Sequence, residues 1–225
     1  MLGSKVSYLW DDARAPHGFV SGVSLHSHTN QSRESLDFLA NFGNQFPMMR
    51  PILATGERIW RRKYGLGIDY NHSDWTPPLT PRMAYDLESR QIEKLDLLPL
   101  VSLTDHDNIQ APMLLRTVAS ARHIPVSVEW TVSFRGDQAF HLGIHNLPSE
   151  TGSAWMKTFA HFTSKSSDKA LTELLSCLHA MPNVLIIFNH PMWDLFLIGA
   201  QRHAHGPAPC HKGCRVILEY SRSQS

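Results

Sequence analysis

Residues 97–109 read LLPLVSLTDHDNI and place a polar run directly after an apolar one. The apolar part, residues 97–104, has the composition of a buried β-strand. Asp105, His106 and Asp107 follow it at once. In parallel α/β architectures the carboxyl ends of strands face the functional site, so imidazole and carboxylate groups at this position can meet around a metal ion. The stretch predicts one strand of an α/β fold with reactive side chains at its carboxyl end.

The same alternation extends outward from this segment in both directions. Strand-like runs occupy residues 19–25, 124–130, 140–147, 183–189 and 214–220, and helical patterns occupy residues 35–42, 85–95, 112–121 and 168–180. In the last helix an apolar stripe is formed by Leu171, Leu174, Leu175 and Leu178, and Asp168 is a suitable N-cap. Strands that alternate with helices favour parallel strands joined by crossover helices. We therefore predict an α/β fold.

The overall composition excludes several classes of protein. The 225 residues carry 21 basic and 20 acidic side chains, for a formal charge of +1, so no global field attracts a long nucleic acid or an anionic membrane. The first residues lack a signal-peptide core, and no run approaches the roughly 18 apolar residues of a membrane span. Cys177, Cys210 and Cys214 do not suggest a disulfide framework. We expect a cytoplasmic protein with no membrane partner.

Residues 41–81 break the alternation because they are rich in Pro, Gly, Trp and Arg. Two interpretations stay open at this point. The segment is an insertion or lid over a site, or it is a surface excursion that packs its own tryptophans.

Histidines recur at the ends of the expected strands. His26 and His28 follow the first, Glu129 ends the third, His141 lies in the fourth and His190 follows the fifth. On an extended segment His26 and His28 project to the same side and can chelate one ion. A single histidine is more often a satisfied polar residue than a ligand. The repeated placement at strand ends favours a metal site.

These residues resemble the motifs of the PHP (polymerase and histidinol phosphatase) family. The matching segments appear in the family's order and span residues 22–193: SLHSHT (24–29), SLTDHDNI (102–109), the Glu of VEW (128–130), FHLGIH (140–145) and FNHP (188–191). The resemblance implies one domain over residues 1–225, folded as a distorted barrel of seven β/α units. It also implies up to three divalent ions, Mn, Zn or Fe, at the carboxyl ends of the strands.

The resemblance further implies a role for each motif residue. His26 and His28 would bind one ion, Glu129 would bridge two, His141 and His190 would bind the second, and His106 would bind a third. Of Asp105 and Asp107, one would orient the ring of His106 and the other would serve in proton transfer. His145 shares a strand face with His141, and we expect it to pack or to support the site.

Two departures from the family pattern alter these expectations. Arg33 stands where the family has an Asp or His ligand, so either Glu34 or Asp37 replaces it, or the third ion is lacking and Arg33 binds a substrate phosphate. The family's C-terminal Asp-x-His has no counterpart after His190, so we predict a barrel that is incomplete at its C-terminus, with an atypical tail at residues 203–225. An alternative for the tail is a zinc knuckle made by His203, His205, Cys210, His211 and Cys214.

The expected function is hydrolysis of a phosphate ester, a small phosphomonoester or a nucleotide, by metal-activated water. Asp105, Asp107 and Glu129 are the catalytic candidates, and the candidates for binding substrate phosphate are Arg33, Arg122 and Arg135. One alternative is a catalytically impaired or truncated PHP-like module that binds a metal or a partner. Another is a truncated chain that folds poorly, and the nearest rival enzyme is a metal-dependent amide or ester hydrolase. The oligomeric state stays open.

Overall fold

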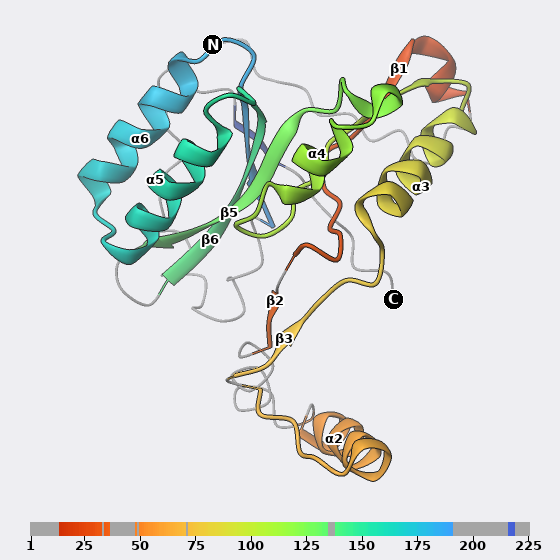
Figure 1. Cartoon of the computed structure of the whole chain (residues 1–225), viewed down its shortest axis with the longest axis vertical. Helices are drawn as coiled ribbons and strands as arrows, with labels where there is room; N and C mark the ends of the chain where they lie inside the picture. The colour runs from red at the N-terminus through yellow and green to blue at the C-terminus, as the bar shows by residue number, and fades with distance from the viewer. Residues whose placement is uncertain are drawn as a thin grey trace.

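The computed structural model describes residues 14–32, 34–36, 48, 50–70, 72–134, 138–190 and 216–218. They form a mixed helix and sheet structure, as predicted (Figure 1). The strands are β1 (Ser21–Ser24), β2 (Glu34–Ser35), β3 (Asp74–Trp75), β4 (Leu98–Val101), β5 (Val126–Phe134), β6 (Gln138–Leu147), β7 (Leu185–Asn189) and β8 (Val216–Leu218). The helices are α2 (Arg50–Tyr64), α3 (Pro81–Glu93), α4 (Gln110–Leu115), α5 (Gly152–Ser164) and α6 (Asp168–Ala180), with 3-10 turns at η1 (Ala15–Gly18) and η3 (Ala119–Ala121).

The larger sheet has the strand order β5-β6-β7-β8. β5 pairs with β6, and β6 with β7, in antiparallel fashion, whereas β7 and β8 are parallel. The prediction of parallel strands is therefore wrong for β5, β6 and β7. Three residues separate β5 from β6, and a parallel crossover needs a dozen or more. Connection length thus decides the direction of this pair.

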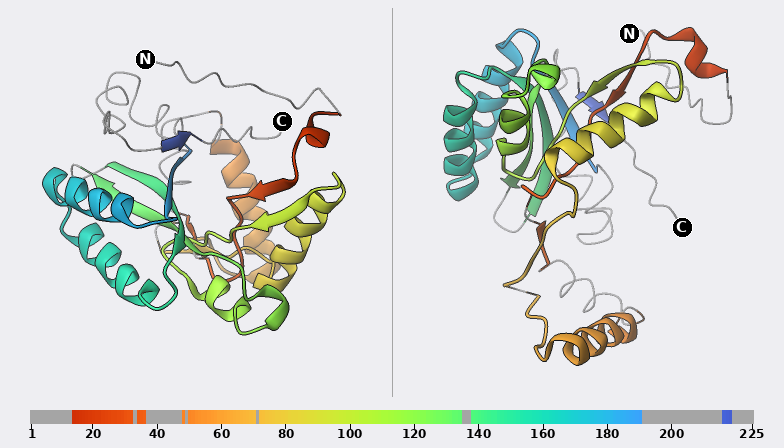
Figure 2. Two further views of the ribbon diagram at one scale, coloured as in Figure 1. Left: turned by 90° about the horizontal axis from the view of Figure 1, so that it is seen from above. Right: turned by 45° about the vertical axis from the view of Figure 1, so that its right-hand side comes forward.

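The two faces of the larger sheet differ because side chains alternate along each strand. Val128 and Trp130 of β5 and Ile144 of β6 face a core completed by α5 and α6, which cover one side of the sheet (Figure 2, left). The indole of Trp130 stacks on the ring of Phe159 at a centroid distance of 4.5 Å. Glu129 of β5 and its register partner Gly143 of β6 alternate with these core residues and lie on the opposite face. The functional side chains lie on this second face.

The smaller sheet pairs β1 with β4 in parallel, as predicted. Helix α3 packs against β4, and Gly22 of β1 must lack a side chain because a Cβ there would lie 2.7 Å from Cγ2 of Ile92. The chain after β4 then meets β5 through a parallel bridge between His106 and Glu129. The described strands form open sheets, and the barrel of seven β/α units stays a prediction.

The predicted helices are confirmed in part. Helix α6 has the predicted bounds, but its N-cap is Ser167, whose Oγ accepts from the N–H of Ala170, and not Asp168. The prediction of a helix at residues 35–42 is wrong at its start, because Ser35 lies in β2, and residues 37–42 lie outside the described residues. Helix α5 was not predicted. Its sequence offers no side-chain cap and its stripe mixes Trp, Met and Phe with Thr and His.

Helix α2 lies within the segment predicted to be an insertion or lid. None of its residues is buried, and it lies apart from both sheets beyond the β2–β3 pair (Figure 1; Figure 2, right). Within the helix the rings of Trp60 and Tyr64 pack together at a centroid distance of 4.2 Å. A lid function for residues 41–81 stays a prediction. No helix in the described part of the chain is long and apolar enough to cross a membrane.

Candidate metal centre

All seven residues predicted to bind metal come together in the structure. They arrive from three sheets and from the loops that follow the strands: His26 and His28 after β1, Glu34 in β2, His106 after β4, Glu129 in β5, His141 in β6 and His190 after β7. Their ligand atoms form three groups, within each of which the atoms lie no more than 4.8 Å apart. The groups are His26–Glu129–His190, His106–Glu129–His141 and His28–Glu34–His106.

Glu129 lies at the centre of this cluster and is fully buried. Its Oε2 faces Nε2 of His28, His26 and His106 at 3.2, 3.6 and 3.8 Å. Its Oε1 faces Nδ1 of His141 at 3.3 Å and Nε2 of His190 at 3.6 Å. Neither oxygen accepts a hydrogen bond of good geometry from the described residues. The two oxygens therefore face different imidazoles, and the carboxylate belongs to two of the three groups.

Burial sets the charge of the surrounding imidazoles. Desolvation lowers the pKa of His26 to about 4 and that of His106 to about 3. Burial alone would raise the pKa of Glu129, but contact with His141 and His28 outweighs it and holds that pKa below its ordinary value. At neutral pH His26 and His106 are thus neutral and Glu129 is ionised, the protonation states that bind a divalent cation. Burial also acts to lower the pKa of His28, but contact with Glu129 outweighs it and raises that pKa.

Asp105 and Asp107 hold the backbone on either side of His106. Asp105 is fully buried and accepts from the backbone N–H and the hydroxyl of Thr29, next to His28. Asp107 accepts from the backbone N–H of Thr131 at 2.9 Å. Neither of these bonds involves the ring of His106, so the orientation of that ring by one of the pair stays a prediction. Proton transfer by the other stays a prediction.

Several polar residues that the sequence reasoning missed support the cluster. Ser32 Oγ accepts from the backbone N–H of His106 at 3.0 Å, and Nδ2 of Asn189 donates to Nδ1 of His26 at 3.2 Å. His145 packs below the cluster, as expected, where its Nδ1 lies 2.8 Å from Oγ of Ser102. The available signal was a polar residue, Asn189, at the end of an otherwise apolar strand.

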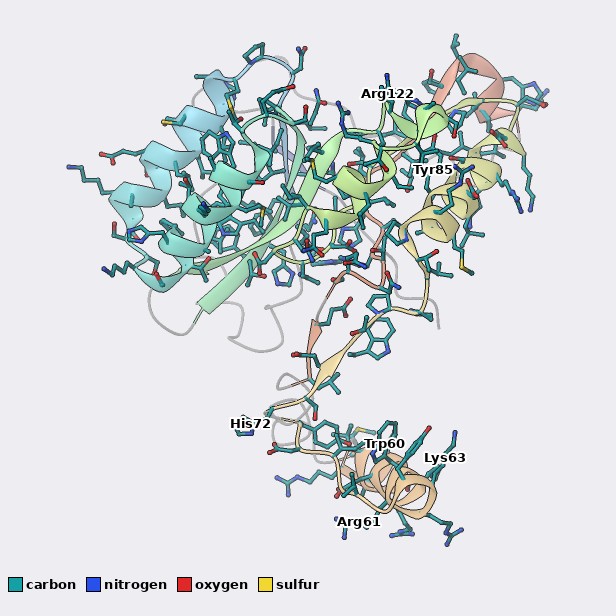
Figure 3. All side chains as sticks on the ribbon, viewed as in Figure 1. Trp60, Arg61, Lys63, His72, Tyr85 and Arg122 are labelled. Carbon is teal, nitrogen blue, oxygen red and sulfur yellow. The ribbon has the colours of Figure 1, made fainter. Side chains whose placement is uncertain are left out.

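The predicted phosphate-binding arginines are not brought to the cluster by any described contact. Arg122 is exposed and precedes β5, at the amino end of that strand (Figure 3). The cluster residues lie farther along β5, in β6 and after β1, β4 and β7, so a phosphate-binding role for Arg122 stays a prediction. Arg33, Arg135, Asp37 and the candidate knuckle residues of the tail lie outside the described residues.

Comparison of the chain with protein-family models, with curated proteins and with solved structures found no match. The site must therefore be interpreted from its own geometry.

Proposed function

We propose that this chain is a metal-dependent phosphoesterase with a PHP-type barrel, which hydrolyses a small phosphomonoester or a nucleotide. The observation that carries the proposal is Glu129, a fully buried carboxylate with five imidazole nitrogens within 3.8 Å. A buried charge of this kind is stabilised when it is paired or coordinates metal ions.

The residues fit divalent cations in both number and chemistry. Glu129 and His106 each belong to two of the three groups, so neighbouring ions would share ligands. Mixed imidazole and carboxylate donors suit Mn²⁺, Zn²⁺ or Fe²⁺ better than Ca²⁺. Glu34 completes the third group, so it takes the place that Arg33 cannot fill.

Paired divalent ions, when bound, would supply a nucleophilic hydroxide near neutral pH and would neutralise charge on the phosphoryl group. The protein's own contribution is to hold the ligands rigidly. Asp105 ties the loop of His28 to the loop of His106, and Asp107 ties the latter to β5. Such positioning supplies much of the rate acceleration in phosphoryl transfer because little reorganisation is then required.

The test combines metal content with turnover. The purified chain would be analysed for bound metal and then assayed with Mn²⁺, Zn²⁺ or Fe²⁺ on a phosphomonoester, a nucleotide, a phosphodiester and a carboxylic ester. Glu129→Gln removes the bridging charge, and Glu150→Gln makes the same change on an exposed residue and serves as the matched control.

We expect at least two equivalents of metal and phosphate release in the control, and loss of both in Glu129→Gln. Hydrolysis of the carboxylic ester alone would favour the rival hydrolase. Metal binding without turnover on any substrate would favour the impaired, binding module. Absence of metal under replete conditions would refute the proposal.

A further inference from the structure

Asn189 and His145 lie side by side beneath the candidate metal centre, on the face of the larger sheet that is turned away from α5 and α6. Both are almost fully buried, with exposed fractions of 2% and 3%. A Cβ at Gly143 would lie 2.8 Å from Nε2 of His145 and 3.1 Å from Oδ1 of Asn189, so the two side chains meet over this glycine. Since both atoms are near one point, they lie within about 6 Å of each other.

His145 is paired through one ring nitrogen. Its Nδ1 lies 2.8 Å from Oγ of Ser102, which in turn lies 2.7 Å from Oγ of Ser127. Its Nε2 and Oδ1 of Asn189 both lack a hydrogen-bond partner among the described residues. An unpaired buried acceptor costs about 1–3 kcal/mol, so the Asn189 amide gains when its oxygen meets a donor.

His26 can supply that donor. The amide nitrogen of Asn189 lies 3.2 Å from Nδ1 of His26. A half-turn of the amide exchanges its oxygen and nitrogen within the same volume, so Oδ1 then faces Nδ1 of His26. Nδ1 must in that case carry the hydrogen, and the lone pair of Nε2, which faces Glu129 at 3.6 Å, is directed into the cluster.

We propose that Asn189 is a positioning residue whose amide oxygen sets the tautomer of His26 for metal binding. The inference rests on the metal-binding part of the proposed function. It adds a supporting residue to the ligands, because partners of the second ring nitrogen commonly raise metal affinity by about 10–100-fold.

The first experiment measures Co²⁺ affinity by absorption, a readout independent of turnover. Asn189→Leu removes the acceptor and should weaken Co²⁺ binding by about 10–100-fold. Asn189→Asp keeps an oxygen toward His26 and should bind Co²⁺ at least as tightly as the wild type. Asn30→Leu makes the same apolar change on an exposed residue of the loop that carries His28, and should leave the affinity unchanged.

A second variant approaches the same contact from another side. Gly143→Ala leaves the side chains of Asn189 and His145 intact but inserts a methyl group against both of them. It should weaken Co²⁺ binding in the same direction as Asn189→Leu. Urea unfolding of each variant in EDTA shows whether the fold is kept.

The direct observation is the tautomer itself. In the Zn²⁺-loaded wild type, ¹⁵N spectra of the histidines should show His26 carrying its hydrogen on Nδ1. If the wild type binds no Co²⁺ or Zn²⁺, the proposed metal centre fails. If the wild type binds but Asn189→Leu and Gly143→Ala bind equally well, or if His26 carries its hydrogen on Nε2, only the role of Asn189 is refuted.

Discussion

Two sheets of this protein, β1–β4 and β5–β8, contribute most of the cluster but are stabilised very differently. The β5–β8 sheet buries Trp130, Ile144 and their neighbours under α5 and α6. The β1–β4 pair has α3 on one face, whereas on the other Val23, Leu98 and Leu100 are 57%, 63% and 52% exposed. Apolar burial stabilises a structure in proportion to the area removed from water, so the larger sheet is the more stable support.

The cluster joins these unequal supports. The weaker pair delivers His26, His28 and His106, and the larger sheet delivers Glu129, His141 and His190. A bound ion would therefore act across the junction as well as in chemistry. Four experiments test this difference in stability between the two sheets, from the largest expected effect to the smallest.

Truncation of the larger core should give the greatest loss. Trp130 is fully buried against Phe159 and Phe162, so Trp130→Ala should lower the free energy of unfolding by about 3–5 kcal/mol. Urea denaturation followed by circular dichroism measures it. A loss below about 1 kcal/mol would mean that this core is not the main support.

Addition of metal should act mainly on the weaker pair. Zn²⁺ at 100 times its Kd should raise the free energy of unfolding by about 2.7 kcal/mol, because only the folded state presents the cluster. Hydrogen exchange should slow more in β1 and β4 than in β6. Equal slowing in all three strands would contradict a role for the ion in joining the sheets.

Acid should destabilise the chain when metal is removed with EDTA. Burial lowers the pKa of His26 and of His145 to about 4, against about 6.5 in an unfolded chain. Between these values the unfolded state binds more protons, so the free energy of unfolding falls as the pH falls. We expect each of the two groups to contribute a loss of about 2 kcal/mol between pH 7 and 5, and His106, whose pKa burial lowers to about 3, acts in the same direction. Glu129, whose pKa is also lowered, extends the loss to lower pH, while the raised pKa of His28 opposes it.

The control for this pH dependence is the variant in which both His26 and His145 are replaced by Gln. Its urea midpoint should depend less on pH over the same range. An equally steep dependence would place the responsible protons elsewhere in the chain.

The smallest effect is expected on the exposed face of the β1–β4 pair. Leu100 is half exposed there, so Leu100→Ser should change the free energy of unfolding by no more than about 0.5 kcal/mol. Urea denaturation beside the Trp130→Ala variant gives the contrast. A loss of several kcal/mol would show that this face is covered in solution.

The cluster was easier to predict from the sequence than the sheet that carries it. The ligands were found because His26, His28 and His106 follow apolar runs whose strand character depends on local composition. The direction of β6 depends on its partners, and helix α5 on packing against Trp130 and its neighbours, neither of which a local pattern contains. Asn189 was missed because its role depends on His26, which is distant in sequence.

That distance has a consequence for biosynthesis. His26 and Asn189 are 163 positions apart, so at about 5–20 residues per second the ribosome makes the second roughly 8–30 seconds after the first. During this interval the nascent chain holds at most a partial set of ligands, and Glu129, His141 and His190 join the set in turn. Loading with an ion would thus be a late event that depends on a finished fold.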